Sequence, residues 1–255
     1  MSTETYISDD EIRNCENSDL ICLDAYRKYD LDSDYTAAGF DVGKKRHPSH
    51  LSIYIKSGNK IVQKYQIFLD GWPYTKQIKF LNMVMENFDI DKGYVDNTRG
   101  ELEERGLHHK WAALTFTAKQ KRRMAQIFEE YVHSGNLEII PDERQRSQII
   151  CVDNELNAPE TPMGHGDSFF SNALALMAMR EGTEHNTRNV GDVQDLVDNR
   201  RSSLKTIYNG FGEKEIMQEE ACPKCGQVGG WVKEHQKCLL CFADSMFDGT
   251  QSYFR

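Results

Sequence analysis

Residues 37–55, AAGFDVGKKRHPSHLSIYI, decide how this chain folds. A short apolar run ends at Gly43, a polar turn follows, and LSIYI then alternates in polarity. The next run, KIVQKYQIFL at 60–69, comes after the turn residues KSGN. Extended runs separated by turn residues are typical of antiparallel strands. We therefore expect a hairpin or meander that begins near Ala37.

Helical and extended segments alternate after this meander. Apolar residues recur with helical spacing in 74–90, and the extended segment KGYVDNTRGE follows. A second helix is expected to begin after Thr117 and to end near Gly135. Short strands are expected in NLEIIP and again in RSQIICVDNEL at 146–156, and a last helix begins at Asp167. This order predicts an α/β fold, a mixed sheet with helices packed on it.

The bulk composition excludes several classes of protein. The chain has 255 residues and a formal net charge of -9, so it is not a protein that coats nucleic acid through overall positive charge. No stretch approaches the ~18 apolar residues of a membrane span, and no signal peptide is recognisable. Four of the seven cysteines cluster near the C-terminus, as in metal sites of a reducing compartment. We expect a soluble protein with no membrane partner.

Three aspartates stand at the boundaries of the expected elements. Asp41 lies in the first strand, Asp96 at the end of a later strand and Asp167 at the start of the last helix. Taken singly, each has an ordinary structural role, as an exposed strand residue, an Asx-turn residue or a helix N-cap. Taken together, they have the distribution by which ribonuclease H-like nucleases gather carboxylates around two divalent cations. Carboxylate oxygens suit Mg²⁺ and Mn²⁺, and a pair of such ions serves phosphodiester hydrolysis.

Four stretches carry a resemblance to a known family. They are 37–55, YVDNTRGELEERG at 94–106, FTAKQKRRMAQIFEEYVHSGNLEIIPDE at 116–143 and GHGDSFFSNALALMAM at 164–179. In order and spacing they resemble the C-terminal nuclease domain of large terminase subunits, the DNA-packaging motors of tailed bacteriophages. The opening ISDDEIRNCE resembles the segment that links such a nuclease to its ATPase, so the resemblance covers about residues 7–180. It implies a ribonuclease H-like mixed sheet flanked by helices.

The resemblance also assigns roles to individual residues. It implies that Asp41, Asp96 and Asp167 are catalytic and hold two Mg²⁺ or Mn²⁺ ions. His165 lies beside the last of them and is counted among the catalytic residues, where it touches metal or scissile phosphate; a plain loop histidine is the alternative.

The sequence departs from the family pattern in three places. Arg99 and Gly100 occupy the turn where the family often has a glycine pair, and Arg99 either contacts phosphate or is exposed. Gly166 stands where many relatives carry a further acidic residue. No GxxxxGK[ST] phosphate loop occurs, so we expect the packaging ATPase to be a partner of this chain or the other half of a split gene.

Basic residues flank the expected carboxylate site. Those expected to contact the DNA backbone, together with Arg99, are Lys44, Lys45, Arg46, Lys119, Lys121 and Arg122. Each phosphate contact releases counterions and makes DNA affinity depend on salt. For the basic run at 119–123, a solvated helix face is the alternative.

A cysteine module lies near the C-terminus. In CPKCGQVGGWVKEHQKCLLC, two Cys-x2-Cys pairs are separated by twelve residues, which predicts that Cys222, Cys225, Cys238 and Cys241 bind one structural Zn²⁺. So short a segment has almost no core, so metal binding would supply most of its folding free energy. DNA contact and docking to a packaging partner are both open as its role.

These observations predict a domain order and a function. We expect an N-terminal arm or linker at 1–36, a nuclease domain at 37–182, a polar linker at 183–215 and a zinc ribbon at 216–250. The predicted activity is metal-dependent cutting of concatemeric phage DNA, with double-stranded DNA, the packaging ATPase, the small terminase subunit and the portal protein as partners.

Two alternatives stay open. One is a resolvase-like or transposon-encoded nuclease of the same fold, and the other is a non-catalytic zinc-ribbon adaptor that binds DNA or portal protein. The expected location is the cytoplasm of an infected bacterium and, transiently, the viral procapsid.

Overall fold

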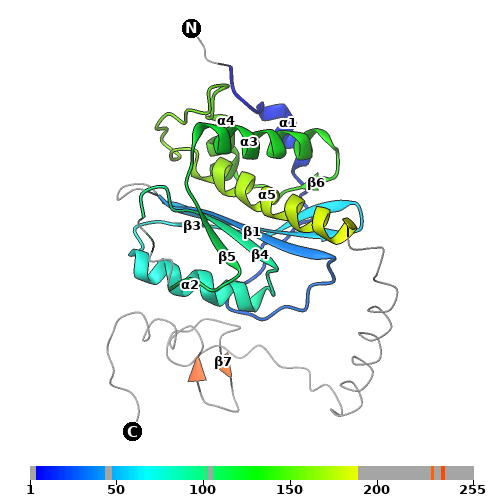
Figure 1. Cartoon of the computed structure of the whole chain (residues 1–255), viewed down its shortest axis with the longest axis vertical. Helices are drawn as coiled ribbons and strands as arrows, with labels where there is room; N and C mark the ends of the chain where they lie inside the picture. The colour runs from blue at the N-terminus through cyan, green and yellow to red at the C-terminus, as the bar shows by residue number, and fades with distance from the viewer. Residues whose placement is uncertain are drawn as a thin grey trace. The chain divides into compact units, whose positions relative to one another are not determined.

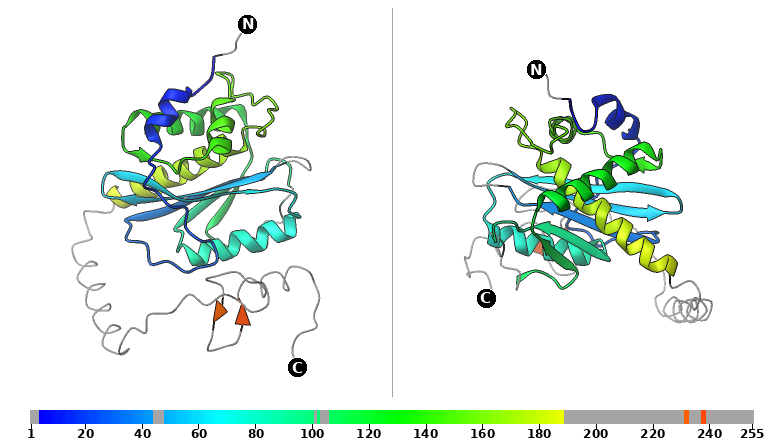
Figure 2. Two further views of the ribbon diagram at one scale, coloured as in Figure 1. Left: turned by 180° about the vertical axis from the view of Figure 1, so that it is seen from behind. Right: turned by 45° about the horizontal axis from the view of Figure 1, so that its top comes forward.

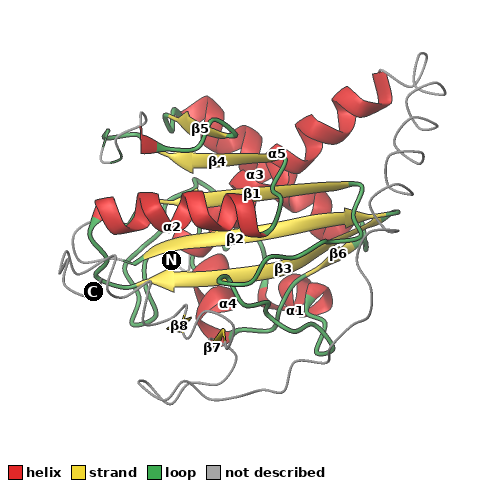
Figure 3. Cartoon of the chain, turned by 90° about the horizontal axis from the view of Figure 1, so that it is seen from below, coloured by secondary structure: helices red, strands yellow, loops and turns green. Residues whose placement is uncertain are grey.

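Six strands from residues 35–138 form one mixed sheet (Figure 1). This computed structural model describes residues 4–43, 48–100, 102, 106–188, 231–232 and 237–238. The strands are β1 (Tyr35–Asp41), β2 (Ser49–Ser57), β3 (Lys60–Leu69), β4 (Lys92–Asp96), β5 (Trp111–Leu114) and β6 (Leu137–Glu138). Their order across the sheet is β5-β4-β1-β2-β3-β6 (Figure 3).

The strand directions divide the sheet into two parts. β1, β2 and β3 form the expected antiparallel meander, whereas β4 runs parallel to β1 and β5 runs parallel to β4. β6 is a short parallel addition at the edge beside β3. A meander continued by parallel strands on the side of its first strand is the ribonuclease H-like arrangement, so the predicted fold class is confirmed.

Helices cover both faces of the sheet (Figure 2). The helix α2 (Tyr74–Asn87) lies on one face. The opposite face carries α1 (Asp9–Cys15), α3 (Ala118–His133), α4 (Glu143–Ile150) and α5 (Asp167–Arg188). Every residue of β1 after the first is buried, as are the first seven of β2. The central strands are therefore buried on both sides, as expected for a sheet packed between two helical layers.

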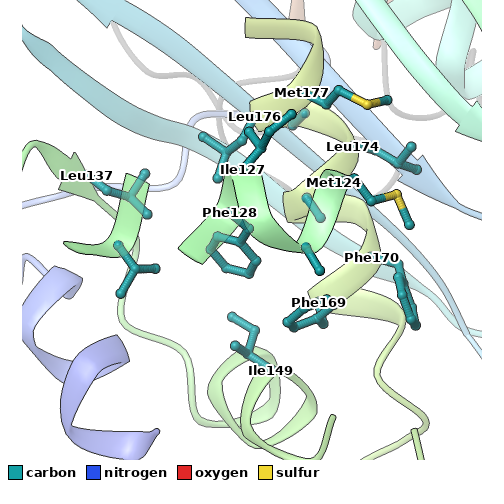
Figure 4. Close-up of a cluster of buried hydrophobic side chains, with 14 of the residues drawn as sticks. Met124, Ile127, Phe128, Leu137, Ile149, Phe169, Phe170, Leu174, Leu176 and Met177 are labelled. Carbon is teal, nitrogen blue, oxygen red and sulfur yellow. The ribbon is translucent and has the colours of Figure 1, made fainter. Parts of the chain in front are cut away.

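The helix α5 is the centre of the larger helical layer. Residues 166–179 are all buried, because α5 packs on the sheet with one side and on the outer helices with the other. Figure 4 shows Phe128 of α3, Ile149 of α4 and Phe169 of α5 converging in this cluster. The run 173–179 is apolar around the whole helix circumference, which is typical of such a buried position.

Gly39 sets the distance between β1 and α5. A Cβ atom at this position would lie 2.0 Å from the carbonyl oxygen of Ser171 and 2.3 Å from the backbone nitrogen of Ala175. Only a residue without a side chain lets the strand backbone approach the helix backbone so closely. The glycine therefore places the start of α5 directly over β1.

The prediction of a strand in 146–156 is wrong. The structure forms α4 up to Ile150, and Asp142 caps it by accepting a hydrogen bond from the Gln145 amide at 2.7 Å. The buried face of α4 consists of Gln145, Gln148 and Ile149, at helical spacing. Because two of these three residues are polar, apolar periodicity does not reveal the helix, and the apolar run that follows resembles a strand.

The residues before β1 pack on the rest of the first compact unit, which spans Met1–Asn186. Ser8 and Glu11 form a reciprocal capping box at the start of α1, and Ile12 is fully buried. Within the second unit, Thr187–Arg255, the structure describes the last two residues of α5 and the antiparallel pair of β7 (Trp231–Val232) and β8 (Lys237–Cys238). None of the helices in the described ranges is long and apolar enough to cross a membrane.

Candidate carboxylate site

Three predicted residues meet at one edge of the sheet. Asp41 is the last residue of β1, Asp96 is the last residue of β4, and Asp167 is the first residue of α5. Because β1 and β4 are parallel neighbours, with Phe40 opposite Val95, their carboxyl ends lie side by side. The start of α5 lies over the same edge, so three segments far apart in sequence bring their carboxylates to one place.

A cavity of about 230 Å³ lies between these carboxylates. Its lining residues are Asp41, Val42, Asp96, Thr98, Arg99, Phe116, Lys121, His165, Asp167 and Phe170. All three aspartates and His165 therefore line one cavity. The aromatic residues and Thr98 were not predicted, although Phe170 lies three positions after Asp167 and so shares its helix face.

Asp41 is a buried carboxylate with two acidic neighbours in the site. It is 6% exposed, and burial raises its pKa well above the usual range. The negative charges of Asp167 and Asp96 raise this pKa further, as does a hydrogen bond between the side chains of Asp41 and Asp96. The positive charge of Lys121 acts in the opposite direction. Buried like charges repel, and a bound cation is the arrangement that relieves such repulsion.

Asp96 combines two of the roles expected for it. Its Oδ1 accepts a hydrogen bond from the backbone amide of Thr98 at 2.9 Å and another from the Thr98 hydroxyl, which is the geometry of an Asx turn. The hydroxyl in turn accepts a hydrogen bond from the backbone amide of Phe116. The turn orients the carboxylate at the end of β4 while Asp96 still lines the cavity.

The predicted DNA-contacting residues divide into three groups. Lys121 and Arg99 line the cavity, and the Lys121 ammonium lies 4.9 Å from the centre of the Phe170 ring. Lys119 and Arg122 are exposed on α3 and are not among the lining residues. Lys44, Lys45 and Arg46 lie outside the described residues.

The three carboxylates that line the cavity offer hard oxygen ligands, which suit Mg²⁺ or Mn²⁺. Across the described part of the chain, no three His, Cys, Asp or Glu side chains are drawn together as a ready metal cluster. The carboxylates therefore surround a cavity rather than a closed cage, and their chemistry fits cations that keep water or phosphate oxygens as further ligands.

Of the four predicted zinc ligands, Cys222, Cys225 and Cys241 lie outside the described residues. Cys238 is placed by its backbone, in β8 opposite Trp231.

Comparison with known proteins gives structural matches and no sequence family. No family model and no curated protein matches the sequence. The large terminase nuclease from thermophilic phage G20c matches with 17% identity and a TM-score of 0.49, covering 68% of this chain and 98% of the nuclease. The same nuclease is also known with bound magnesium and with bound cobalt.

Two further phage proteins match at similar levels. The Thermus phage P74-26 large terminase nuclease domain has 16% identity and a TM-score of 0.47, with 68% of this chain and 93% of that domain covered. The HK97 bacteriophage large terminase has 10% identity and a TM-score of 0.49, and the match spans 69% of this chain and 43% of that protein. The fold assignment itself rests on strand order and direction.

Proposed function

We propose that this chain is a divalent-metal-dependent DNA endonuclease of the phage large-terminase type. The observation that carries the proposal is the meeting of Asp41, Asp96 and Asp167 around one cavity, from the ends of β1 and β4 and the start of α5. Residues 37–182 would form the nuclease domain, joined by a linker at 183–215 to a zinc ribbon at 216–250.

The three aspartates would hold two Mg²⁺ or Mn²⁺ ions. When bound, such a pair activates the attacking water and stabilises the leaving oxygen of an in-line phosphodiester displacement. The two buried carboxylates of Asp41 and Asp167, each 6% exposed, would keep a fixed geometry because the surrounding core holds them. Asp96 would complete the set through the carboxylate oxygen that the Asx turn orients.

The remaining polar groups of the cavity would act on the DNA. Lys121 and Arg99 would contact phosphate oxygens, with Lys121 placing a positive charge beside the carboxylates. His165 would contact metal or the scissile phosphate, since it lines the same cavity as Asp167. The exposed Lys119 and Arg122, together with Lys44, Lys45 and Arg46, would bind the flanking backbone.

The biological substrate would be concatemeric double-stranded phage DNA. The partners would be the packaging ATPase, the small terminase subunit and the portal protein, in the cytoplasm of an infected bacterium and transiently at the procapsid. Cys222, Cys225, Cys238 and Cys241 would bind one structural Zn²⁺, and the ribbon would contact DNA or a packaging partner.

The experiment is cleavage of supercoiled plasmid by the purified chain in Mn²⁺ or Mg²⁺. Asp96→Asn removes one carboxylate and should lower the cutting rate at least about 100-fold. Mutation of residues that merely hydrogen-bond a metal ligand already lowers metal affinity or activity by about 10- to 100-fold, and loss of a ligand should cost at least as much. The matched control is Asp89→Asn, the same chemical change at an exposed residue outside the cavity with φ 44°, a conformation that asparagine tolerates.

The outcomes separate the candidate functions. Cutting by wild type and Asp89→Asn that is absent in Asp96→Asn and in EDTA supports the proposal. A strong preference for branched DNA over plasmid would indicate a resolvase-like enzyme. A folded wild type that binds DNA and cuts no substrate would indicate an adaptor and overturn the proposal.

A further inference from the structure

The fully buried side chain of Gln148 joins α4 to the segment that leads into α5. Its Nε2 donates a hydrogen bond to the carbonyl oxygen of Met163 at 2.8 Å. Its Oε1 accepts a hydrogen bond from the backbone amide of Ser168 at 3.0 Å. A single amide group thus holds both ends of the segment 163–168, which carries His165 and Asp167.

The backbone of this segment is shaped to receive that amide. Gly164 has φ 129° and Gly166 has φ 71°, conformations that residues with a side chain rarely adopt. A Cβ atom on Gly164 would lie 1.9 Å from Nε2 of Gln148. Two backbone hydrogen bonds between Thr161 and Gly164, at 2.9 and 3.0 Å, close the preceding turn. The turn, the two glycines and the Gln148 amide together constrain the backbone path of the segment 163–168.

Gln148 also satisfies a backbone amide at the start of α5. The first amides of a helix have no partner within the helix, and a side chain at the N-terminus usually satisfies one of them. In α5, the amide of Ser168 is satisfied by Gln148 from another helix, and the Ser168 hydroxyl donates to the carbonyl oxygen of Gln145 at 2.8 Å. The start of α5 is therefore anchored to α4, while Asp167 lines the cavity.

We propose that Gln148 is a positioning residue of the nuclease, whose amide sets the placement of Asp167 and His165 relative to Asp41. The inference rests on the proposed function, because Gln148 would hold Asp167 in position relative to the other two carboxylates of the proposed metal site. Loss of the amide would loosen the segment 163–168 and weaken cation binding, with the DNA-contacting groups on α3 left in place.

The test is Gln148→Met, which keeps the length of the side chain and removes both hydrogen bonds. The matched control is Gln63→Met, because Gln63 is equally buried and belongs to the neighbouring polar layer, where it accepts from the Ile140 amide, without touching 163–168. Mn²⁺ affinity is measured by calorimetry without DNA, and the Mn²⁺ concentration for half-maximal plasmid cutting and the KM for DNA are measured in parallel.

Gln148→Met should bind Mn²⁺ about 10- to 100-fold more weakly than wild type. The Mn²⁺ concentration for half-maximal cutting should rise by the same factor, and the KM for DNA should not change. Gln63→Met should behave like wild type in all three measurements. Equal Mn²⁺ affinities of the two variants would overturn the inference. If Gln148→Met does not fold, Gly164→Ala carries the same test, since its Cβ would displace the amide without removing it. A wild type that binds Mn²⁺ and cuts nothing would overturn the proposed function alone, because the calorimetric comparison still decides the role of Gln148.

Discussion

His50 should make the stability of the fold depend on pH in a way that one substitution removes. Its ring is completely buried, with Nδ1 2.5 Å from the hydroxyl of Ser171 and Nε2 2.9 Å from Oε1 of Gln66. Burial lowers the pKa of His50 to about 4; the hydrogen bond to Gln66 and the charge of Asp142 oppose this shift, and the charge of Arg144 adds to it. The perturbation is His50→Gln, which keeps a neutral polar group of similar reach and removes the titration.

The sign and size of the pH effect on folding stability follow from proton linkage. In the unfolded chain the imidazole has a pKa of about 6.5 and takes up most of a proton between pH 7 and pH 5, whereas the folded ring takes up very little. The unfolded state therefore binds more protons in this window, so stability falls as pH falls, by about 2 kcal/mol for this one group. Asp41 acts in the opposite sense, because its raised pKa costs stability as pH rises, and it is present in both proteins.

The assay is urea unfolding in EDTA at pH 7 and pH 5, for wild type and His50→Gln. The quantity compared is the change in the free energy of unfolding between the two pH values, so any loss from the substitution itself cancels. Wild type should lose about 2 kcal/mol more than the variant. Equal losses, with equal urea dependence in both proteins, would refute the account of His50 as a buried neutral ring.

Three further predictions follow from the fold and the site. Gly39→Ala should lower the free energy of unfolding by at least about 3 kcal/mol in urea titrations, because its Cβ would meet the backbone of α5 at 2.0 Å; a loss under 1 kcal/mol would contradict that packing. Lys121→Met should slow plasmid cutting at saturating DNA by on the order of 10- to 100-fold. The control Lys119→Met, also on α3 but not among the cavity-lining residues, should change the cutting rate by less than about 2-fold. Equal effects of the two substitutions would mean that Lys121 lies on an ordinary solvated face. Native mass spectrometry should find one Zn²⁺ per chain, lost in Cys222→Ser, and a metal-free wild type would remove the zinc ribbon.

The sheet could be predicted from sequence because its signals are local. The run at 37–69 contains strands and turn residues in a repeating order, and the structure forms β1 to β3 there. Helix signals were equally clear where a cap and an apolar face coincide. Thr117 caps α3 by accepting a hydrogen bond from the Gln120 amide, and α3 ends beside Gly135. The convergence of the aspartates was expected from the resemblance of their joint distribution to that of ribonuclease H-like nucleases, since each one alone has an ordinary structural role.

Other features depend on contacts between distant segments and leave no local signal. Gln148 can be recognised as a positioning residue only once α4 lies beside the start of α5, since its hydrogen-bond partners are 15 and 20 residues away in sequence. Ile12, in a segment expected to be an arm, is fully buried because α1 packs on α3 and α4. The buried face of α4 is mostly polar, so the sequence shows no apolar helical period there. Its glutamines can be buried because hydrogen-bond partners from other elements satisfy them, and those partners cannot be read from the local sequence.

If Asp41, Asp96 and Asp167 hold divalent cations in one cavity, crystals soaked in Mn²⁺ should show the ions by anomalous diffraction, with Asp96→Asn as the control crystal. Two anomalous peaks about 4 Å apart are expected between the three carboxylates in wild type, with at least one of them absent in the variant. A wild-type crystal with full Mn²⁺ exposure and no anomalous peak in the cavity would contradict this role of the aspartates.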